Sequence, residues 1–234
     1  VMISVFLGAH YVLYLNFIEQ GIIPDFSDVL HLIPLALAVF LFFFKLRLFD
    51  EIKDIESDAV HHPERPLPRE ILTKNDVLRI SFILIVLEIA LFSFYGIWAF
   101  LSAMIAVSYS LVMYREFFIK EWLRARLTTY AVTHTFVVVF VSLAVFVALF
   151  GKPFTKIPGD LLYFSLAGWF LFNIFEFGRK TFARSEEKNE VDSYSKIFGK
   201  FGAVMLVLAM AALSIVFINK AAVPAVINIL SLWL

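Results

Sequence analysis

A run of acidic residues between Asp50 and Asp58 is the part of this sequence whose residue types and spacing could do chemistry. Glu51, Asp54 and Asp58 lie at i, i+3 and i+7, a spacing that stacks three carboxylates on one face of a helix. Like charges at this spacing repel one another, and a divalent cation relieves the repulsion because Mg²⁺ prefers oxygen ligands. A solvated polar face is the other interpretation. Because the run follows directly on a hydrophobic segment, we favour a Mg²⁺ site.

The elements that must position this run are strongly apolar. The chain has 234 residues, 61% of them hydrophobic, and no cysteine. This composition is typical of a polytopic membrane protein, and the lack of cysteine excludes disulfides and thiolate metal sites. A net charge of +0 gives no reason to expect nucleic acid as a partner. We expect one all-α transmembrane domain, residues 1–234, with about eight visible helices around a central cavity. The apolar segments are 1–17, 29–49, 77–95, 97–114, 127–150, 161–177, 201–219 and a short last one that follows Lys220.

The basic residues predict the orientation of these segments. Lysine and arginine are concentrated in the connections 50–76, 115–126 and 178–200, whereas the opposite connections hold only Lys152, Lys156 and Lys220. Counting the crossings places the three basic connections on one side, and the positive-inside rule makes that side cytoplasmic. We therefore expect a multi-pass integral membrane protein with the acidic run at its cytoplasmic face.

Local signals predict two helix boundaries within this arrangement. Thr73 has an acidic residue, Asp76, three positions later, which is the pattern of a helix start. Gly96 interrupts the apolar run and indicates a break between two helices.

The acidic run resembles the first aspartate-rich motif of the UbiA superfamily of intramembrane prenyltransferases. That motif, N-D-x-x-D-x-x-x-D, lies at the cytoplasmic end of the second helix, and an R-P pair follows it. This sequence has Asp50-Glu51-x-x-Asp54-x-x-x-Asp58, and then Arg65-Pro-Leu. Asp50 replaces the Asn and Glu51 replaces the first Asp, so both positions keep an oxygen ligand. The Gly that usually follows R-P-L is absent.

The second aspartate-rich motif of the family, D-x-x-D-x-x-x-D, is degraded in this sequence. Glu176 lies where the first acid is expected, at the edge of the membrane. Arg179 and Lys180 stand where the next acid is expected, and further acids appear only later, as at Glu187. The two basic residues either replace a metal as the positive charge near a phosphate or only anchor the helix at the cytoplasmic edge.

The resemblance implies Mg²⁺-dependent transfer of a polyprenyl group from a polyprenyl diphosphate to an acceptor within the membrane. The partners are then this isoprenoid donor, or a related lipid, and the membrane lipids. The sequence names no acceptor. The candidate metal ligands are Glu51, Asp54, Asp58 and Glu176, with Asp54 and Asp58 also catalytic; the candidate diphosphate-binding residues are Asp50, Arg65, Arg124, Arg179 and Lys180; the secondary candidates are Glu88, Asn173, Glu187 and Tyr194.

Two other functions remain open. The donor could be a phosphorylated sugar and the acceptor a polyprenyl phosphate, as in phosphoribosyl-type transfer. The degraded second motif could instead mark a non-catalytic membrane protein that binds or transports a divalent metal or a lipid. Release of diphosphate distinguishes both enzymes from the binding protein or transporter.

Polar residues inside the apolar segments allow competing interpretations. Glu88 lies in the middle of the third segment, where it either marks a functional site or is protonated and hydrogen-bonded to a neighbouring helix. Lys45 and Arg47 are close enough to the segment end for their side chains to reach the membrane surface. We interpret His10 and His134 as packing residues, and Tyr130 likewise.

Overall fold

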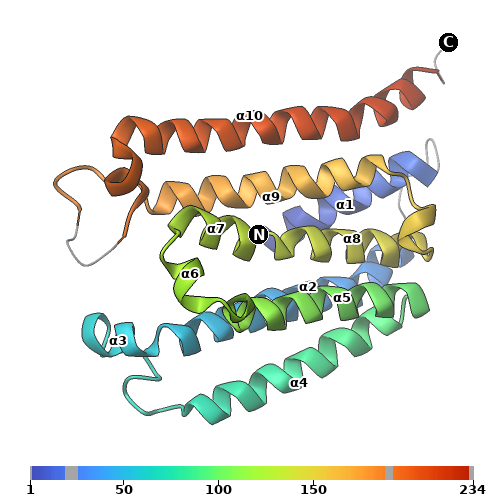
Figure 1. The fold of residues 1–234 in the computed structure, drawn as a ribbon. Helices are drawn as coiled ribbons and strands as arrows, with labels where there is room; N and C mark the ends of the chain where they lie inside the picture. The colour runs from blue at the N-terminus through green and yellow to red at the C-terminus, as the bar shows by residue number, and fades with distance from the viewer. Residues whose placement is uncertain (1, 19–25, 188–191, 232–234) are drawn as a thin grey trace.

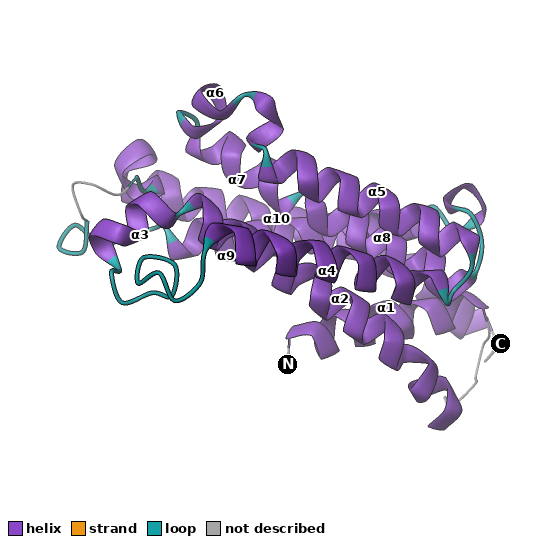
Figure 2. Cartoon of the chain, turned by 90° about the horizontal axis from the view of Figure 1, so that it is seen from below, coloured by secondary structure: helices purple, strands orange, loops and turns teal. Residues whose placement is uncertain are grey.

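The computed structural model describes residues 2–18, 26–187 and 192–231, and every regular element in these ranges is a helix (Figure 1). The long helices lie side by side in an elongated bundle (Figures 1 and 2). The predicted all-α fold is confirmed. The helices are α1 Met2–Ile18, α2 Phe26–Lys53, α3 Ile55–His61, α4 Lys74–Ser93, α5 Ile97–Tyr114, α6 Lys120–Arg124, α7 Leu127–Thr135, α8 Val137–Phe150, α9 Asp160–Arg179 and α10 Tyr194–Ser231, with the 3-10 helices η1 Glu116–Phe118 and η2 Phe154–Lys156.

Five helical spans in the described residues are long and apolar enough to cross a membrane. Their outer faces carry large exposed apolar side chains, such as Phe201 with 77% of its surface exposed, as helices in contact with lipid do. The chain is therefore an integral membrane protein. The five spans are Leu30–Lys53, Ile97–Tyr114, Leu127–Phe150, Asp160–Arg179 and Tyr194–Ala222.

The predicted count of eight segments is not confirmed. The last two expected segments, 201–219 and the one after Lys220, form a single helix, α10, in the described residues. Lys220 does not end the helix, because its ammonium lies over the rings of Tyr163 and Phe217, at 5.4 and 5.8 Å from their centroids. The two local boundary signals agree with the structure. Thr73 and Asp76 form a capping box at the start of α4, and Gly96 adopts a φ of +94°, which favours glycine, between α4 and α5.

The core of the bundle lies between α2, α5 and α8. It contains the fully buried Leu35 and Ala38 of α2 and a row of small residues, including Ala103 of α5 and Ala144 of α8. Small side chains let membrane helices approach closely, which compensates for the lack of a hydrophobic driving force in lipid. The helix α4 contacts α2, α9 contacts α8, and α10 contacts α9. This packing fixes the position of the ends of α2 and α9, which carry charged residues, and of α7, which carries His134.

Candidate functional site

Three charged segments meet at one end of the bundle. Figures 1 and 2 place α3, α6 and the end of α9 that leads toward α10 at the same end. The electrostatic contacts agree with this view, because Asp50 at the end of α2 lies close enough to Arg179 of α9 for their charges to interact. The two aspartate-rich regions, far apart in the sequence, are thus neighbours in the fold.

The acidic run crosses a helix boundary. The helix α2 ends at Lys53 and α3 begins at Ile55, while Asp54 is the N-cap between them, with φ −91° and ψ 0°. The prediction of one uninterrupted helix face from Glu51 to Asp58 is therefore wrong. The helical hydrogen-bond pattern nevertheless continues across the break, since the amide of Asp58 donates to the carbonyl of Asp54 at 2.7 Å.

Two of the acids in the run are bound to arginines. Arg47 donates to Glu51 at 2.6 Å, and Arg65 of the R-P pair donates to the buried Asp58 at 2.6 Å. This hydrogen bond to Asp58, together with its negative charge, raises the pKa of Arg65. Asp54 has no side-chain partner among the described residues. Within the same residues, no three His, Asp or Glu side chains form a group that could hold a metal ion.

The end of α9 is neutralised locally. Glu176 accepts a hydrogen bond from Arg179 at 2.6 Å and lies 3.5 Å from the ammonium of Lys180. These pairs have the i, i+3 and i, i+4 spacing of helix surface contacts. A second metal contact through Glu176 and phosphate binding by Arg179 and Lys180 stay predictions.

The middle loop holds an ion pair between a buried carboxylate and an exposed arginine, which the sequence did not indicate. Arg124 donates to both carboxylate oxygens of Glu116, at 2.7 to 3.0 Å, and only 4% of the Glu116 side chain is exposed. The hydrogen bonds from Arg124 raise its own pKa. Glu116, Phe117 and Phe118 all have φ between 51° and 61°, an unusual region for residues other than glycine. The ion pair thus holds a sharply turned loop at the charged end. Arg124, which is predicted to contact a phosphate, is paired with Glu116.

Lys53 lies in the middle of this charged end. Its ammonium is 3.3 Å from the carbonyl oxygen of Met113, at the end of α5, and 3.4 Å from Nε2 of His134 on α7. The ring of His134 stacks on that of Tyr130, with centroids 3.8 Å apart. In the sequence, Lys53 is only one of the basic residues of the connection 50–76, and His134 is interpreted as a packing residue. Only the fold shows that the two meet, because they are 81 residues apart.

The secondary candidates near the second motif have structural partners. The amide of Asn173, fully buried, donates to the Trp169 carbonyl at 2.9 Å, and its oxygen accepts from Thr135 on α7 at 3.0 Å. The Tyr194 hydroxyl, also from a buried side chain, donates to the carbonyl of Leu127 at 3.4 Å. These bonds connect α7 to α9 and α10, just below the charged residues.

Glu187 lies in the connection between α9 and α10. Its carboxylate accepts hydrogen bonds from the hydroxyl of Ser193 at 2.8 and 2.9 Å. Hydrogen bonds from Ser195 and Ser193 hold the pKa of Glu187 below its usual value. Its described contacts therefore stabilise the connection itself.

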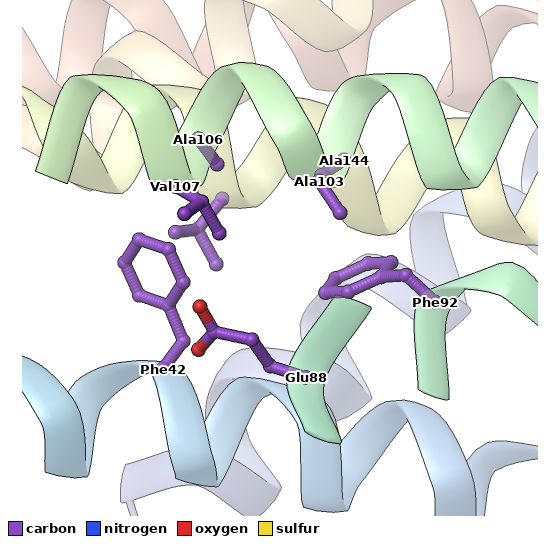
Figure 3. Close-up of a pocket in the computed structure, with 8 residues that line it drawn as sticks. Phe42, Glu88, Phe92, Ala103, Ala106, Val107 and Ala144 are labelled. Carbon is purple, nitrogen blue, oxygen red and sulfur yellow. The ribbon is translucent and has the colours of Figure 1, made fainter. Parts of the chain in front are cut away.

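Glu88, the intramembrane candidate, is bound to another helix. Lys45 of α2 donates to it at 2.5 Å, and the two side chains are 0% and 1% exposed. The expectation that Lys45 reaches the membrane surface is therefore wrong, because a buried carboxylate lies within its reach. Oε2 of Glu88 has no hydrogen-bond partner among the described residues, and the carboxylate points toward Phe42 and Val107 (Figure 3).

An apolar cavity lies below the charged end. It has a volume of about 380 Å³ and is lined by α1, α2, α8 and α9, with Phe43 and Phe172 on facing helices. Phe43 precedes Asp50 by seven residues, which corresponds to about 10 Å along a helix. His10 lines its wall, and Nε2 of His10 is 2.7 Å from the hydroxyl of Ser142. An apolar chain with a charged head group would suit this combination of cavity and charged end.

Comparison with known proteins gives one match. The sequence model of the UbiA prenyltransferase family matches residues 8–234, almost the whole chain. No curated protein and no solved structure matches it.

Proposed function

Because this chain belongs to the UbiA prenyltransferase family, we propose that it transfers a polyprenyl group from a polyprenyl diphosphate to an acceptor within the membrane. The observation that carries the proposal is the meeting of the acidic end of α2 with the charged end of α9 and with His134 of α7, above an apolar cavity. A prenyl diphosphate has the matching chemistry, since its head is highly charged and its tail is a hydrocarbon.

The acidic run fits Mg²⁺ in chemical type. Mg²⁺ is usually held by one or two carboxylates, and water and substrate phosphates complete its octahedral shell. A preformed group of three protein ligands is therefore not required, and the described residues contain none. Asp54, which has no side-chain partner in the described part of the chain, would hold the ion, with Glu51 or Asp58 as a second carboxylate. When bound, Mg²⁺ supplies positive charge to the leaving diphosphate.

The protein's own residues support the reaction in two ways. Arg65, which lies beside the acidic run through its bond to Asp58, can place positive charge near a diphosphate. The apolar walls of the cavity exclude water from the carbon end of the donor, so that a carbocation formed on ionisation meets the acceptor rather than water. Charge stabilisation at one end and exclusion of water at the other are what this transfer needs.

Release of diphosphate tests the proposed function. We expect the purified protein in lipid vesicles to release diphosphate from prenyl diphosphates when Mg²⁺ and a suitable acceptor are present. Aromatic acids, quinone precursors, tetrapyrroles and glycerol lipids would serve as acceptors. A phosphoribosyl diphosphate with a polyprenyl phosphate acceptor would run in parallel. Release from the sugar donor alone would replace the proposal by the phosphoribosyl alternative, and release from neither donor would contradict both.

The orientation of the charged end gives a second prediction. Because the basic connections should face the cytoplasm, single cysteines replacing Ser57 and Ser185 should react with an impermeant thiol reagent only from inside. A cysteine replacing Lys156, in η2 at the opposite end of the bundle, should react only from outside (Figure 1). The chain has no cysteine of its own, so the background is clean. Labelling of positions 57 and 185 from opposite sides would refute a single charged end on one face.

A further inference from the structure

Lys53 differs from five other cations of the charged end in what neutralises its charge. Arg47, Arg65 and Arg124 each lie within ion-pair distance of a carboxylate, and so do the two basic residues at the end of α9. No carboxylate in the described residues lies within that distance of the Lys53 ammonium, although Asp50 and Asp54 flank it in the sequence. Its side chain is half-buried, so solvent neutralises its charge only in part.

The two groups that Lys53 does contact are both neutral acceptors. Nδ1 of His134 is 2.8 Å from the carbonyl oxygen of Tyr130, which can only accept, so Nδ1 carries the proton. Nε2 then has a free lone pair and accepts from Lys53, and the Met113 carbonyl is the second acceptor. At 3.3 and 3.4 Å, both contacts are longer than the usual N–H···O distance of about 2.9 Å. An ammonium has three N–H donors, so Lys53 keeps one donor and its full charge.

The surroundings of Lys53 favour an anion that is brought by a ligand. The charges of Asp50, Asp54, Glu116 and Arg124 all act on Lys53, which places it where the end of α2, the middle loop and α7 converge. Two of the cations that the sequence suggested for a phosphate, Arg179 and Lys180, are paired with Glu176. The other two, Arg65 and Arg124, are paired with Asp58 and Glu116. A diphosphate at this end would meet, in Lys53, a half-buried cation that has no carboxylate within ion-pair distance among the described residues.

We propose that the ammonium of Lys53 binds a phosphate oxygen of the donor diphosphate. The inference rests on the proposed function, because it is that function which brings a diphosphate to this end. The lysine acts as a positive charge already in place before any metal arrives, and it contacts the donor in its ground state. Lys53 thereby becomes a substrate-binding residue.

A purely structural role for Lys53 makes a different prediction. The carbonyl groups at the end of a helix carry partial negative charge, so Lys53 could serve only to hold the end of α2 against that of α5. Loss of such a contact would lower stability and leave the diphosphate affinity of the folded protein unchanged.

Calorimetric titration with inorganic diphosphate and Mg²⁺ separates the two roles. We compare wild type with Lys53→Met, Lys53→Gln and Lys53→Arg, each checked for folding by thermal unfolding. Lys53→Gln keeps an N–H donor for the Met113 carbonyl but has no charge. Lys120→Met, at the exposed start of α6, removes one positive charge from the same end and is the control. A lost hydrogen bond to a charged group corresponds to a change in affinity of about tenfold or more.

We expect Lys53→Met and Lys53→Gln to weaken diphosphate binding by about tenfold or more, and Lys53→Arg and Lys120→Met to bind nearly as wild type does. Diphosphate binding by Lys53→Gln with wild-type affinity would overturn the proposal for Lys53 and leave the proposed function intact. A wild-type protein that neither binds diphosphate nor releases it from any donor would overturn both.

Discussion

Changing Asp54 to Asn is expected to lower Mg²⁺-dependent release of diphosphate by about 10²- to 10³-fold, the loss seen when one group that stabilises a leaving charge is removed. Asp54 suits this test because its carboxylate has no partner among the described residues, so its replacement breaks no ion pair. Its backbone caps α3, and Asn is as good an N-cap residue as Asp. The variant should therefore fold normally while the acidic run loses one negative charge.

A matched control lies two residues further along the chain, in the first turn of α3. Glu56→Gln removes one negative charge from an exposed position of α3 outside the motif and should leave the release rate unchanged. Both proteins would be assayed in vesicles over a range of Mg²⁺ concentrations, with thermal unfolding as a check on folding. If Asp54→Asn released diphosphate as fast as Glu56→Gln, the acidic run would be a solvated polar face and the site would lie elsewhere.

Asp58 needs a different interpretation from Asp54. Asp58→Asn should also abolish turnover, but it breaks the bond to Arg65 as well. A loss of activity in this variant therefore combines a metal effect with the release of the loop. Arg65→Met breaks the same bond and also removes a proposed diphosphate contact, but it keeps the carboxylate. A larger loss in Asp58→Asn than in Arg65→Met would therefore be due to the carboxylate itself.

Periodic and local features of the fold could be predicted from the sequence. The start of α4 at Thr73 and the break at Gly96 depend on residues next to each other in the chain, and the apolar helices follow from composition. The length of α10 could not be predicted from Lys220, because the rings of Tyr163 and Phe217 that cover its charge are brought there by folding. A single lysine is a weak boundary signal when its side chain can lie along a neighbouring helix.

The candidate site could be predicted in its residue types but not in its pairings. The bond between Glu176 and Arg179 follows from their i, i+3 spacing. The contact between Lys53 and His134 and the inward turn of Glu116 depend on how α2, α5 and α7 pack. From the sequence alone, a lysine is chosen as a phosphate-binding candidate by its place in a motif. The fold adds a second criterion, namely which carboxylates already neutralise its charge.

The pair of Lys45 and Glu88 carries the largest expected effect on stability. Lys45→Met or Glu88→Met alone leaves one charge without its partner in the apolar interior, which typically costs about 3–5 kcal/mol of the free energy of unfolding. The loss of unfolding free energy should reach this range here, because both side chains are at most 1% exposed and neither forms another ion pair among the described residues. The measurement is unfolding in mixed detergent, followed by circular dichroism.

The double variant Lys45→Met/Glu88→Met is the decisive comparison. Replacing a buried ion pair by apolar residues of similar size is often neutral or stabilising, so the double variant should recover most of the loss seen in each single variant. Met fits both positions, since one lies over the Phe42 ring and the other faces Val107 and small residues of α5 (Figure 3). Arg47→Met, which breaks a partly exposed pair two residues further along α2, should cost less than about 1 kcal/mol. If the single variants at Lys45 and Glu88 lose no more unfolding free energy than Arg47→Met, the ion pair does not hold α2 to α4. If the double variant is as unstable as the single variants, each residue acts through contacts other than their mutual bond.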